Sequence, residues 1–407
     1  MANGSASSLD RSAVHVIAAC YLGWTLDAFD FFIMAFVLNQ VVRTFGVSVG
    51  AGAFAFTLTL ACRFIGALVF GRLADRFGRR PTMIANVLCY AALELLTGFA
   101  TSFTMFLILR GLYGVAMGGE WGVGASLVME SIPARWRGAV SGLLQTGYPM
   151  GFLLASLLSI AEPALGWRGM FFVGAAPALL VLYIRRAVPE SPDWLARDTA
   201  AARVSIFTVL GRNLGLTVFA VCLMMGFNFF SHGSQDLYPS QFLARQHHLP
   251  HADVSLIMII INIGAIVGGL GAGVLSQRIG RRWAIGLLAL LALPVIPLWL
   301  FSNGMVWIAL GGFLIQVCVQ GAWGVVPVYL NEISPPAIRA TFPGAVYQLG
   351  NFLASGNANL QVWLSGPLGS IGAAMALVVG LAGLLIALLV SVGREARDVR
   401  MGRELRA

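Results

Sequence analysis

The sequence predicts an all-α membrane protein, and three observations lead to this fold class. The 407-residue chain is 58% apolar and only 11% charged, whereas a soluble protein of ordinary composition carries about 25% charged residues. Twelve apolar runs are long enough to cross a bilayer, which takes about 20 residues for one helix. Several blocks of sequence also return at a constant spacing of 202 residues. Such repeats predict two pseudo-symmetric bundles of six transmembrane helices.

The expected spans follow one another with short polar connections, and one longer polar stretch separates the first six from the last six. We therefore expect an N-terminal six-helix bundle at 1–187, a linker at 188–214, a C-terminal six-helix bundle at 215–392 and a tail at 393–407, which reads as a short basic surface segment. The expected spans are 15–41, 51–72, 82–101, 104–130, 138–160, 168–187, 215–243, 253–276, 283–301, 305–331, 341–364 and 371–392.

The placement of arginine predicts the orientation of these helices. The chain has no lysine, and 21 of its 26 arginines lie in the N-terminus, in the connections that follow even-numbered spans, or in the tail. Three lie on the other side, and two, Arg63 and Arg110, lie within spans. Positive residues collect on the cytoplasmic side of membrane proteins, so we expect both termini and the linker in the cytoplasm. The net charge of +9 is thus a signal of topology, and we expect no nucleic-acid partner.

Charged residues recur within the repeated blocks at the cytoplasmic ends of the expected helices. Asp75 lies at a helix end with arginines in the turn beyond it, and such a carboxylate can join two bundles through charge-assisted hydrogen bonds. In the second copy Gln277 replaces the aspartate, so we expect a weaker contact there. The alternative is that the arginines only set the topology. The repeated blocks are Gly71–Arg80 with Gly273–Arg282, Gly119–Gly122 with Gly321–Gly324, and Glu130–Arg137 with Glu332–Arg339. The candidate gating residues are Asp75, Arg76, Arg79, Arg80, Glu130, Arg137, Glu332 and Arg339.

One expected span, 215–243, carries a dense polar cluster. In a helix Asn228, His232 and Asp236 follow one another at steps of four residues, with Gln235 beside them, so they form one polar stripe. Titratable residues are costly inside a bilayer unless they face protein or a water-filled cavity. We therefore expect this stripe to face the pathway of a solute.

Charges that occur in only one half are the candidates for binding the solute and the proton. At the spacing of 202 residues, Arg63 corresponds to Ala265 and Glu120 to Ala322. At 1.5 Å per residue, Arg63 lies roughly 12 Å and Glu120 roughly 15 Å from the cytoplasmic ends of their helices. Arginine can hold a carboxylate with two parallel hydrogen bonds, and histidine titrates near neutral pH. The alternative is a buried Arg63–Glu120 ion pair that holds two helices together. The proton-coupling candidates are Asp27, Asp30, Glu120, His232 and Asp236.

Neutral polar residues on three other spans complete the candidate binding site, although such residues also hold membrane helices together. The substrate-binding candidates are Arg63, Asn228, His232, Gln235, Gln145, Tyr148, Gln320, Gln348 and Asn351. The five cysteines are scattered without metal-ligand spacing, and the chain has no nucleotide-binding loop. We therefore expect a transporter driven by a proton gradient, without cofactor or metal, and not an enzyme.

Two motifs resemble those of a known superfamily. The block Gly71–Arg80 is similar to the signature G-x-x-x-D-R-x-G-R-R between helices 2 and 3 of the major facilitator superfamily. Pro189–Trp194 resembles the PESPRW element that follows helix 6 in its sugar-type members, with Asp193 in place of arginine. The resemblance extends along the whole chain. It implies the fold of that superfamily, with twelve helices in two pseudo-symmetric bundles, a central site near the membrane midplane, and alternating access.

The polar stripe gives a finer resemblance. Asn228–Ser240 is similar to the motif N-x-x-[ST]-H-x-[ST]-Q-D-x-x-x-T of the lactate/pyruvate:proton symporters in the sialate:proton symporter family, with Ser240 in place of the final threonine. This resemblance implies proton-coupled symport of a small monocarboxylate by a monomeric, multi-pass protein of the bacterial inner membrane. It also implies that the four polar residues of the stripe serve substrate recognition and proton coupling.

Three alternatives stay open. A symporter for sialic acid, an aromatic acid or a dicarboxylate would share the same scaffold. A drug:proton antiporter would be expected to show G-x-x-x-G-P-x-x-G-G on helix 5, and Gly142–Gly151 does not match it. A non-transporting receptor on this scaffold would bind its ligand without counterflow.

Overall fold

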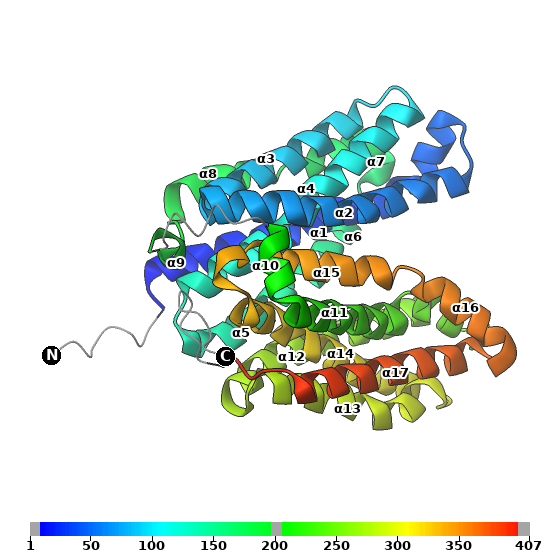
Figure 1. Ribbon diagram of the computed structural model, residues 1–407. Coiled ribbons are helices and arrows are strands. Elements are labelled where there is room, and N and C mark those ends of the chain that lie inside the picture. The colour runs from blue at the N-terminus through cyan, green and yellow to red at the C-terminus, as the bar shows by residue number, and fades with distance from the viewer. Residues whose placement is uncertain (1–8, 197–205, 398–407) are drawn as a thin grey trace.

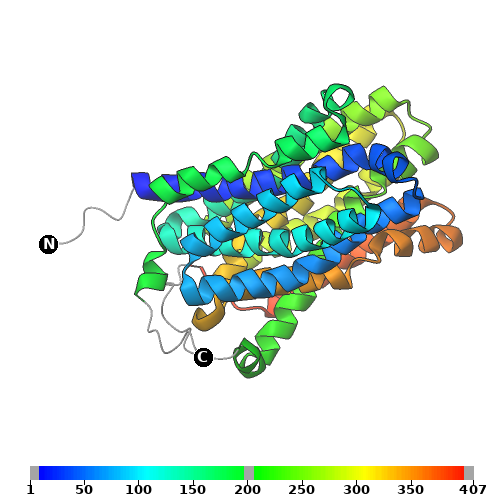
Figure 2. The same cartoon turned by 90° about the horizontal axis from the view of Figure 1, so that it is seen from above.

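The computed structural model describes residues 9–196 and 206–397. Parts of the expected linker and tail, 197–205 and 398–407, lie outside the described residues, as does the extreme N-terminus. Within the described ranges the long helices run roughly side by side (Figures 1 and 2).

The two ends of the described chain lie at the same end of the molecule. The start of α1 (Arg11–Phe45), the end of α17 (Ile371–Val392) and the short helix α9 (Pro192–Leu195) all lie there (Figure 1). We call this end the linker side and the opposite end the far side.

The first half of the chain crosses the bundle six times, and two of the crossings are broken by a bend. One bend is at Thr146, whose hydroxyl donates to the carbonyl of Leu143 at 2.7 Å. The other precedes Pro177, which has no backbone N–H to continue a helix. After α1, the helices are α2 (Val49–Phe77), α3 (Arg79–Gly98), α4 (Phe103–Ser131), α5 (Ala134–Gln145) with α6 (Gly147–Ser159), and α7 (Glu162–Gly174) with α8 (Ala178–Ala187).

The second half repeats this arrangement. After α10 (Ile206–Arg212), α11 (Leu214–Gln235) leads into a π-helix, η2 (Tyr238–Gln246). The crossing that corresponds to α5–α6 is broken in the same way. The other elements are α12 (His251–Ile279), α13 (Arg281–Leu300), α14 (Met305–Ile333), the 3-10 turn η3 (Pro336–Ile338), and α15 (Thr341–Leu353) with α16 (Asn357–Leu368). Each expected span has a helical counterpart, so the predicted all-α architecture of twelve helices is confirmed.

The breaks are a difference from the expected continuous spans. Nine helical stretches of the described chain are long and apolar enough to cross a membrane on their own. The remaining crossings are α4, which contains Arg110, Glu120 and Glu130, and the broken pairs α5–α6 and α15–α16. The residues at the breaks in α5–α6 and α15–α16 are small or polar, so they lower the mean hydropathy of the whole span. Hydropathy therefore does not show at which residue the helix stops.

Each half closes one turn on the linker side in the same way. Gly78 and Gly280 lie between two helices with φ of +109° and +101°, a region that favours glycine. A Cβ at Gly78 would lie 2.3 Å from Glu190 Oε2, and one at Gly280 would lie 2.5 Å from Glu395 Oε2. Each glutamate accepts the backbone N–H groups of the two residues after its glycine. A carboxylate at a helix N-terminus is stabilised by the free N–H groups and by the helix dipole.

The tail therefore contains more than a basic surface segment. Its described part includes Glu395, whose carboxylate accepts from the N–H groups of Arg281 and Arg282 at 3.0 and 3.2 Å. The expectation of a tail that is only a basic surface segment is wrong for Glu395.

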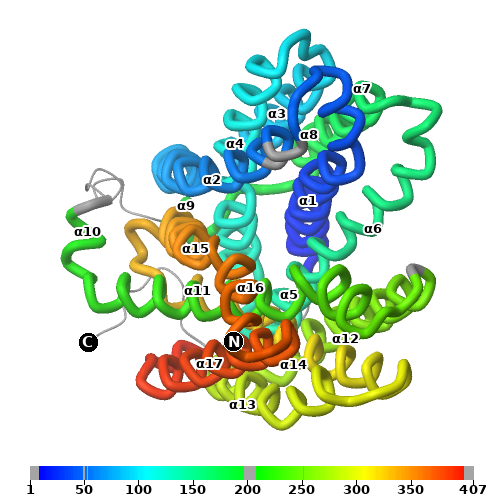
Figure 3. Tube along the Cα trace, turned by 90° about the vertical axis from the view of Figure 1, so that its right-hand side faces the viewer, coloured from blue at the N-terminus to red at the C-terminus, as the bar shows by residue number. Residues whose placement is uncertain are grey.

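The two halves meet on the linker side. α5 packs against α12 and α14, and α15 packs against α2 and α4; Figure 3 shows α15 lying against α2. At the crossing of α5 and α12, a Cβ at Gly142 would lie 2.3 Å from the carbonyl oxygen of Gly269. The continuing helices α6 and α16 have their main contacts within their own halves. The halves are thus in close contact on the linker side and lie apart toward the far side.

Candidate functional site

Asp75 joins the two halves on the linker side. It lies at the end of α2 and is fully buried. Its carboxylate accepts the backbone N–H groups of Ala340 and Thr341, both at 3.1 Å, and the hydroxyl of Thr341 at 2.6 Å. These donors lie at the N-terminus of α15, in the other half. A negative charge at the free N–H groups of a helix is a strong contact, so Asp75 stabilises the closed linker side.

The arginine–glutamate pairs of the repeated blocks lie inside each half. Arg79 donates to Glu130 with two parallel hydrogen bonds, of 2.9 and 2.8 Å. Its repeat counterpart, Arg281, holds Glu332 in the same way at 3.0 and 3.2 Å. Arg79 also lies 3.4 Å from Asp75. These buried pairs hold the ends of neighbouring helices together and position the groups that contact the other half.

A second contact between the halves is built on Gln277, the counterpart of Asp75. Its side-chain oxygen accepts the N–H of Gly138 at 3.2 Å, and its nitrogen donates to the carbonyl of Ala134 at 3.1 Å. Arg137 lies 4.0 Å from Glu332 of the other half. The amide therefore replaces the charged contact by two neutral hydrogen bonds.

The remaining gating candidates lie around these contacts. Arg76 is exposed and lies 5.1 Å from the ring of Phe77. The guanidinium of Arg80 donates to the carbonyl of Arg185. The Arg339 carbonyl accepts the hydroxyl of Ser126 across the halves at 3.0 Å.

Asp193, where the resembling motif has arginine, lies in α9 next to this charge network. Burial, and then the negative charge of Glu130, raise the pKa of the Asp193 carboxyl to about 6, against the opposing effect of Arg339. Neighbouring residues of α9 bond to the network as well: Ser191 donates to Glu130, and Trp194 donates to the carbonyl of Asp75. The linker helix thus rests on the same charges that close the linker side.

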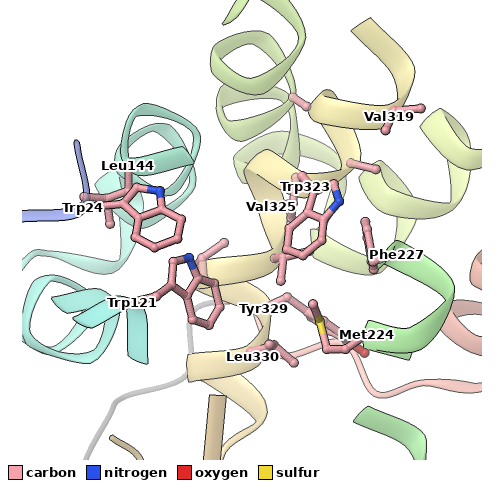
Figure 4. Close-up of a cluster of buried hydrophobic side chains, with 14 of the residues drawn as sticks. Trp24, Trp121, Leu144, Met224, Phe227, Val319, Trp323, Val325, Tyr329 and Leu330 are labelled. Carbon is pink, nitrogen blue, oxygen red and sulfur yellow. The ribbon is translucent and has the colours of Figure 1, made fainter. Parts of the chain in front are cut away.

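Three aromatic rings form a layer between the halves. Trp121 of α4 and Trp323 of α14 are repeat counterparts, and they lie on opposite sides of the junction (Figure 4). The ring of Tyr347 on α15 lies 4.9 Å from Trp121 and 5.5 Å from Trp323. We call these three residues the aromatic layer. It adds an apolar barrier to the polar contacts on the linker side.

Arg63 lies at the centre, level with the aromatic layer. Its guanidinium lies 6.0 Å from the Tyr347 ring, and the side chain is 2% exposed. Its Nε and Nη2 have no hydrogen-bond partner among the described residues. Gln348, also buried, has neither amide atom bonded within the described chain. The expected alternative, an Arg63–Glu120 ion pair, is not formed in the described structure, because both carboxylate oxygens of Glu120 are buried without a partner there.

The polar stripe on α11 lies further toward the far side. His232 Nδ1 is 3.2 Å from Asp236 Oδ1, and these side chains are 46% and 41% exposed. Gln235 donates to Ser231 and to Gln316 of α14, at 3.1 and 3.3 Å. Both side chains interact electrostatically with residues of the first half, His232 with Arg63 and Asp236 with Tyr148, so the pair faces the space between the halves.

Asn228 and Gln320 have other surroundings. Asn228 is 1% exposed and donates to the carbonyl of Met224, one turn earlier in the same helix, at 2.8 Å. Gln320 donates to Ser231 at 3.1 Å and links α14 to the stripe.

Asp27 and Asp30 of α1 are fully buried, and their carboxylate oxygens have no hydrogen-bond partner in the described chain. Next to Asp30 is an ion pair that our sequence reasoning did not predict, in which Arg110 donates to Glu94 at 2.8 Å. A Cβ at Gly174 would lie 2.8 Å from Glu94 Cγ and 3.3 Å from Asp30 Oδ1. The signal for this pair was the presence of two opposite charges on adjacent apolar spans.

The other binding candidates border the same region. Gln145 accepts the indole N–H of Trp121 at 3.0 Å. Tyr148 stacks on Trp24 with ring centroids 5.5 Å apart. Asn351 is half-buried on α15, one turn beyond Gln348.

These features define a class of protein. Two repeated bundles are joined at one side by a network of hydrogen bonds and glycine contacts. Between them lie a buried arginine with two nitrogens that no described residue accepts from, and an exposed His–Asp pair. The arrangement is that of a membrane transporter that is closed on one side, and not that of an enzyme.

The chain belongs to the major facilitator superfamily, because residues 20–356 match that family. It is 32% identical over 347 residues to the probable 4-methylmuconolactone transporter of Cupriavidus pinatubonensis, which covers 83% of this chain and 81% of that protein. It is 28% identical over 382 residues to the sialic acid transporter NanX of Escherichia coli, which covers 91% of this chain and 92% of the other. The predicted superfamily, with a sialate-type branch, is confirmed.

Solved structures show the same fold. The proton:xylose symporter XylE superposes with a TM-score of 0.80 at 20% identity, covering 96% of this chain and 98% of the other. FucP in its outward conformation superposes with a TM-score of 0.76 at 14% identity, covering 94% and 99%. Transporters of this superfamily need no cofactor and use ion gradients, as expected for this chain.

Proposed function

We propose that this protein is a proton-coupled symporter of a small monocarboxylate of the lactate or pyruvate type. It works as a monomer by alternating access in a bacterial inner membrane. The observation that carries this proposal is Arg63, buried between the halves with two guanidinium nitrogens that have no acceptor in the described part of the chain. A buried charge without a partner costs several kcal/mol. A substrate carboxylate would accept hydrogen bonds from the N–H groups of both nitrogens, in the two-pronged geometry that arginine prefers.

The orientation follows from the arginines. Because most of them lie on the linker side, we place this side, with both termini, in the cytoplasm. The structure would then be closed toward the cytoplasm, with the His232–Asp236 pair reached from outside. In this state a substrate enters from the far side and meets the pair before Arg63.

Neutral groups near Arg63 would bind the rest of the substrate. The packing of Gly71 on Thr341 and of Ala67 on Gly344 sets the register of α2 against α15. This register brings Arg63 level with Gln348, whose amide has no partner among the described residues and could bond a hydroxyl or carbonyl oxygen next to a carboxylate. A 2-hydroxy or 2-keto acid carries such an oxygen.

A larger unsaturated or ring acid is the second candidate. Curated relatives include a cis,cis-muconate transport protein and a niacin transporter, both from Acinetobacter baylyi. The aromatic layer beside Arg63 offers flat surfaces on which such an acid could stack. Both candidates share the carboxylate, and they differ in what fills the space next to it.

The test is uptake of labelled L-lactate into proteoliposomes under an imposed inward proton gradient. Wild type should accumulate lactate, and Arg63→Ala and His232→Ala should lose this accumulation. Arg245→Ala, at an exposed arginine on the far side, is the control and should behave as wild type. Failure of the wild type to accumulate lactate would reject the monocarboxylate.

A competition panel on the same vesicles then separates the candidates. Muconate, niacin or sialic acid that displaces labelled lactate would point to the larger acids. Binding of an acid without any counterflow would point to a receptor and overturn the transport mechanism.

A further inference from the structure

A small cavity lies next to the aromatic layer, on its linker side. Its volume is about 10 Å³, room for about one water molecule. From Trp24 on α1 and Trp121 on α4, the lining residues continue toward the linker side. On α14 the cavity is lined by Pro327, one turn beyond Trp323 in the same direction, and this residue belongs to the second half. Figure 4 shows Trp24, Trp121 and Leu144 of its wall. The lining residues are Cys20, Trp24, Glu120, Trp121, Gly124, Ala125, Leu144, Gln145 and Pro327.

Glu120 is the acidic group of this cavity. It is 1% exposed, and neither carboxylate oxygen has a hydrogen-bond partner in the described chain. A Cβ at Gly23 of α1 would lie 2.2 Å from Glu120 Oε1, so the absence of a side chain at Gly23 makes room for the carboxylate. An ionised carboxylate in such a place is costly unless a positive charge offsets it or a proton neutralises it.

The groups around Glu120 come from several helices. Cys20 and Asp27 of α1 and Tyr90 of α3 are close enough to interact electrostatically with it. α2 crosses α4 where Arg63 meets Gly118, and a Cβ at Gly118 would overlap with the carbonyl oxygen of Arg63. α5 adds Leu144 and Gln145 to the cavity and α14 adds Pro327, all of them uncharged.

The other candidate acids have different surroundings. Asp236 is already paired with His232 and is open toward the far side. Asp30 lies against the Glu94–Arg110 pair, away from the junction of the halves. Asp27 is fully buried and does not line the cavity.

We infer that Glu120 is the group that carries the symported proton and releases it into the cytoplasm through this cavity. The inference rests on the proposed function. In the empty carrier the positive Arg63 and the negative Glu120 lie on adjacent helices without forming an ion pair, and together they add no net charge to the centre. When a substrate carboxylate takes Arg63, the centre has one negative charge too many, and a proton on Glu120 restores the balance. Opening of the linker side separates α5 from α14, water enters the cavity, and the O–H bond of Glu120 releases its proton to that water.

This scheme moves one proton with each monocarboxylate. The loaded and the empty centre carry the same net charge, so both can pass between the two conformations. A substrate without a proton would leave an uncompensated charge and could not pass.

The experiment compares net uptake with exchange for Glu120→Gln in proteoliposomes. The glutamine is neutral like the protonated glutamate, so exchange of labelled for unlabelled L-lactate should continue. Accumulation driven by a proton gradient should fall to the level reached without a gradient, and acidification of the lumen, read by an enclosed pH dye, should stop. Glu162→Gln, at the start of α7 outside the centre, is the control and should keep all three properties.

The outcomes separate this inference from the proposed function. Gradient-driven accumulation by Glu120→Gln would overturn the inference alone. Failure of the wild type to accumulate any acid of the panel would overturn the proposed function. Glu120→Asp keeps the acid and should retain part of the accumulation. This variant tests the inference even if the glutamine variant does not fold. An aspartate variant that exchanges but does not accumulate would show that an acid at this position does not carry the proton, and would overturn the inference.

Discussion

Replacing Gly142 by alanine should prevent the halves from closing fully on the linker side. In the closed structure a Cβ at Gly142 would lie 2.3 Å from the carbonyl oxygen of Gly269, where ordinary contacts begin at 3.4 Å. A backbone carbonyl cannot relieve the overlap by changing rotamer as a side chain can. The helices α5 and α12 would therefore have to separate by about 1 Å. Overpacking of a close contact costs about 1–3 kcal/mol.

This cost applies only to the conformation in which α5 and α12 are in contact. The equilibrium therefore moves toward the conformation that is open on the linker side, by about 5- to 150-fold. Transport should slow, because the carrier returns less often to the state that receives substrate from the far side.

The assay is alkylation of Cys20 by N-ethylmaleimide, followed by mass spectrometry at that residue. Cys20 is 2% exposed in the wall of the cavity, so a reagent should reach it when the linker side opens. Gly142→Ala should raise the alkylation rate.

The matched control is Gly269→Ala at the same crossing. Its Cβ would lie 3.6 Å from Gln320 O and 3.7 Å from Gly142 O, ordinary contacts, while the gain in helix propensity is the same. Its alkylation rate should equal that of wild type. An unchanged rate in Gly142→Ala, or an equal rise in both variants, would refute the reasoning.

Three further predictions concern the linker side. Asp75→Asn loses the charge that α15 donors stabilise, about 1.5–3 kcal/mol, and should raise the rate of Cys20 alkylation; an unchanged rate would contradict this contact. Glu395→Ala leaves the first turn of α13 uncapped and should lower the unfolding free energy by about 1 kcal/mol, seen as a lower melting temperature in detergent. Glu190→Ala should have the same effect through α3, and no shift in either variant would count against the caps. Because the pKa of Asp193 is raised to about 6, its protonated form stabilises the folded state below pH 4, and that contribution is lost as the pH rises through 6. The asparagine of Asp193→Asn cannot ionise, so at pH 7.5 the variant should be more stable than wild type by about 1 kcal/mol, after allowance for the partial exposure of this residue. Its melting temperature should be higher than that of wild type at pH 7.5 and equal to it at pH 4. A difference that persists at pH 4 would exclude this titration.

The crossings were predictable from the sequence, because apolar length and the spacing of 202 residues mark them directly. The tryptophans of the aromatic layer could also have been predicted, since Trp121 and Trp323 occur within a repeated block. The partners of Asp75 could not. They are backbone N–H groups of the other half, and a backbone donor leaves no mark in the amino-acid types.

Two other parts of the site depended on packing. Glu395 follows Glu190 by 205 residues, not 202, so the repeat does not reveal it. The stripe stays a prediction as a binding surface, and the structure gives its members different surroundings: Asn228 bonds to the backbone of its own helix, while His232 and Asp236 are about half exposed. A helical repeat gives the face of a residue, and it cannot say how far that face is covered by a neighbouring helix.

The two glutamate caps also imply an order of events while the protein is being made. Glu190 leaves the ribosome before any helix of the second half, so the turn between α2 and α3 can be capped while synthesis continues. Glu395 follows the last transmembrane helix, and the turn between α12 and α13 has to wait for it. The first bundle can thus mature early and serve as a surface for the second, whose central turn stays uncapped until the last transmembrane helix and the residues directly after it have been made.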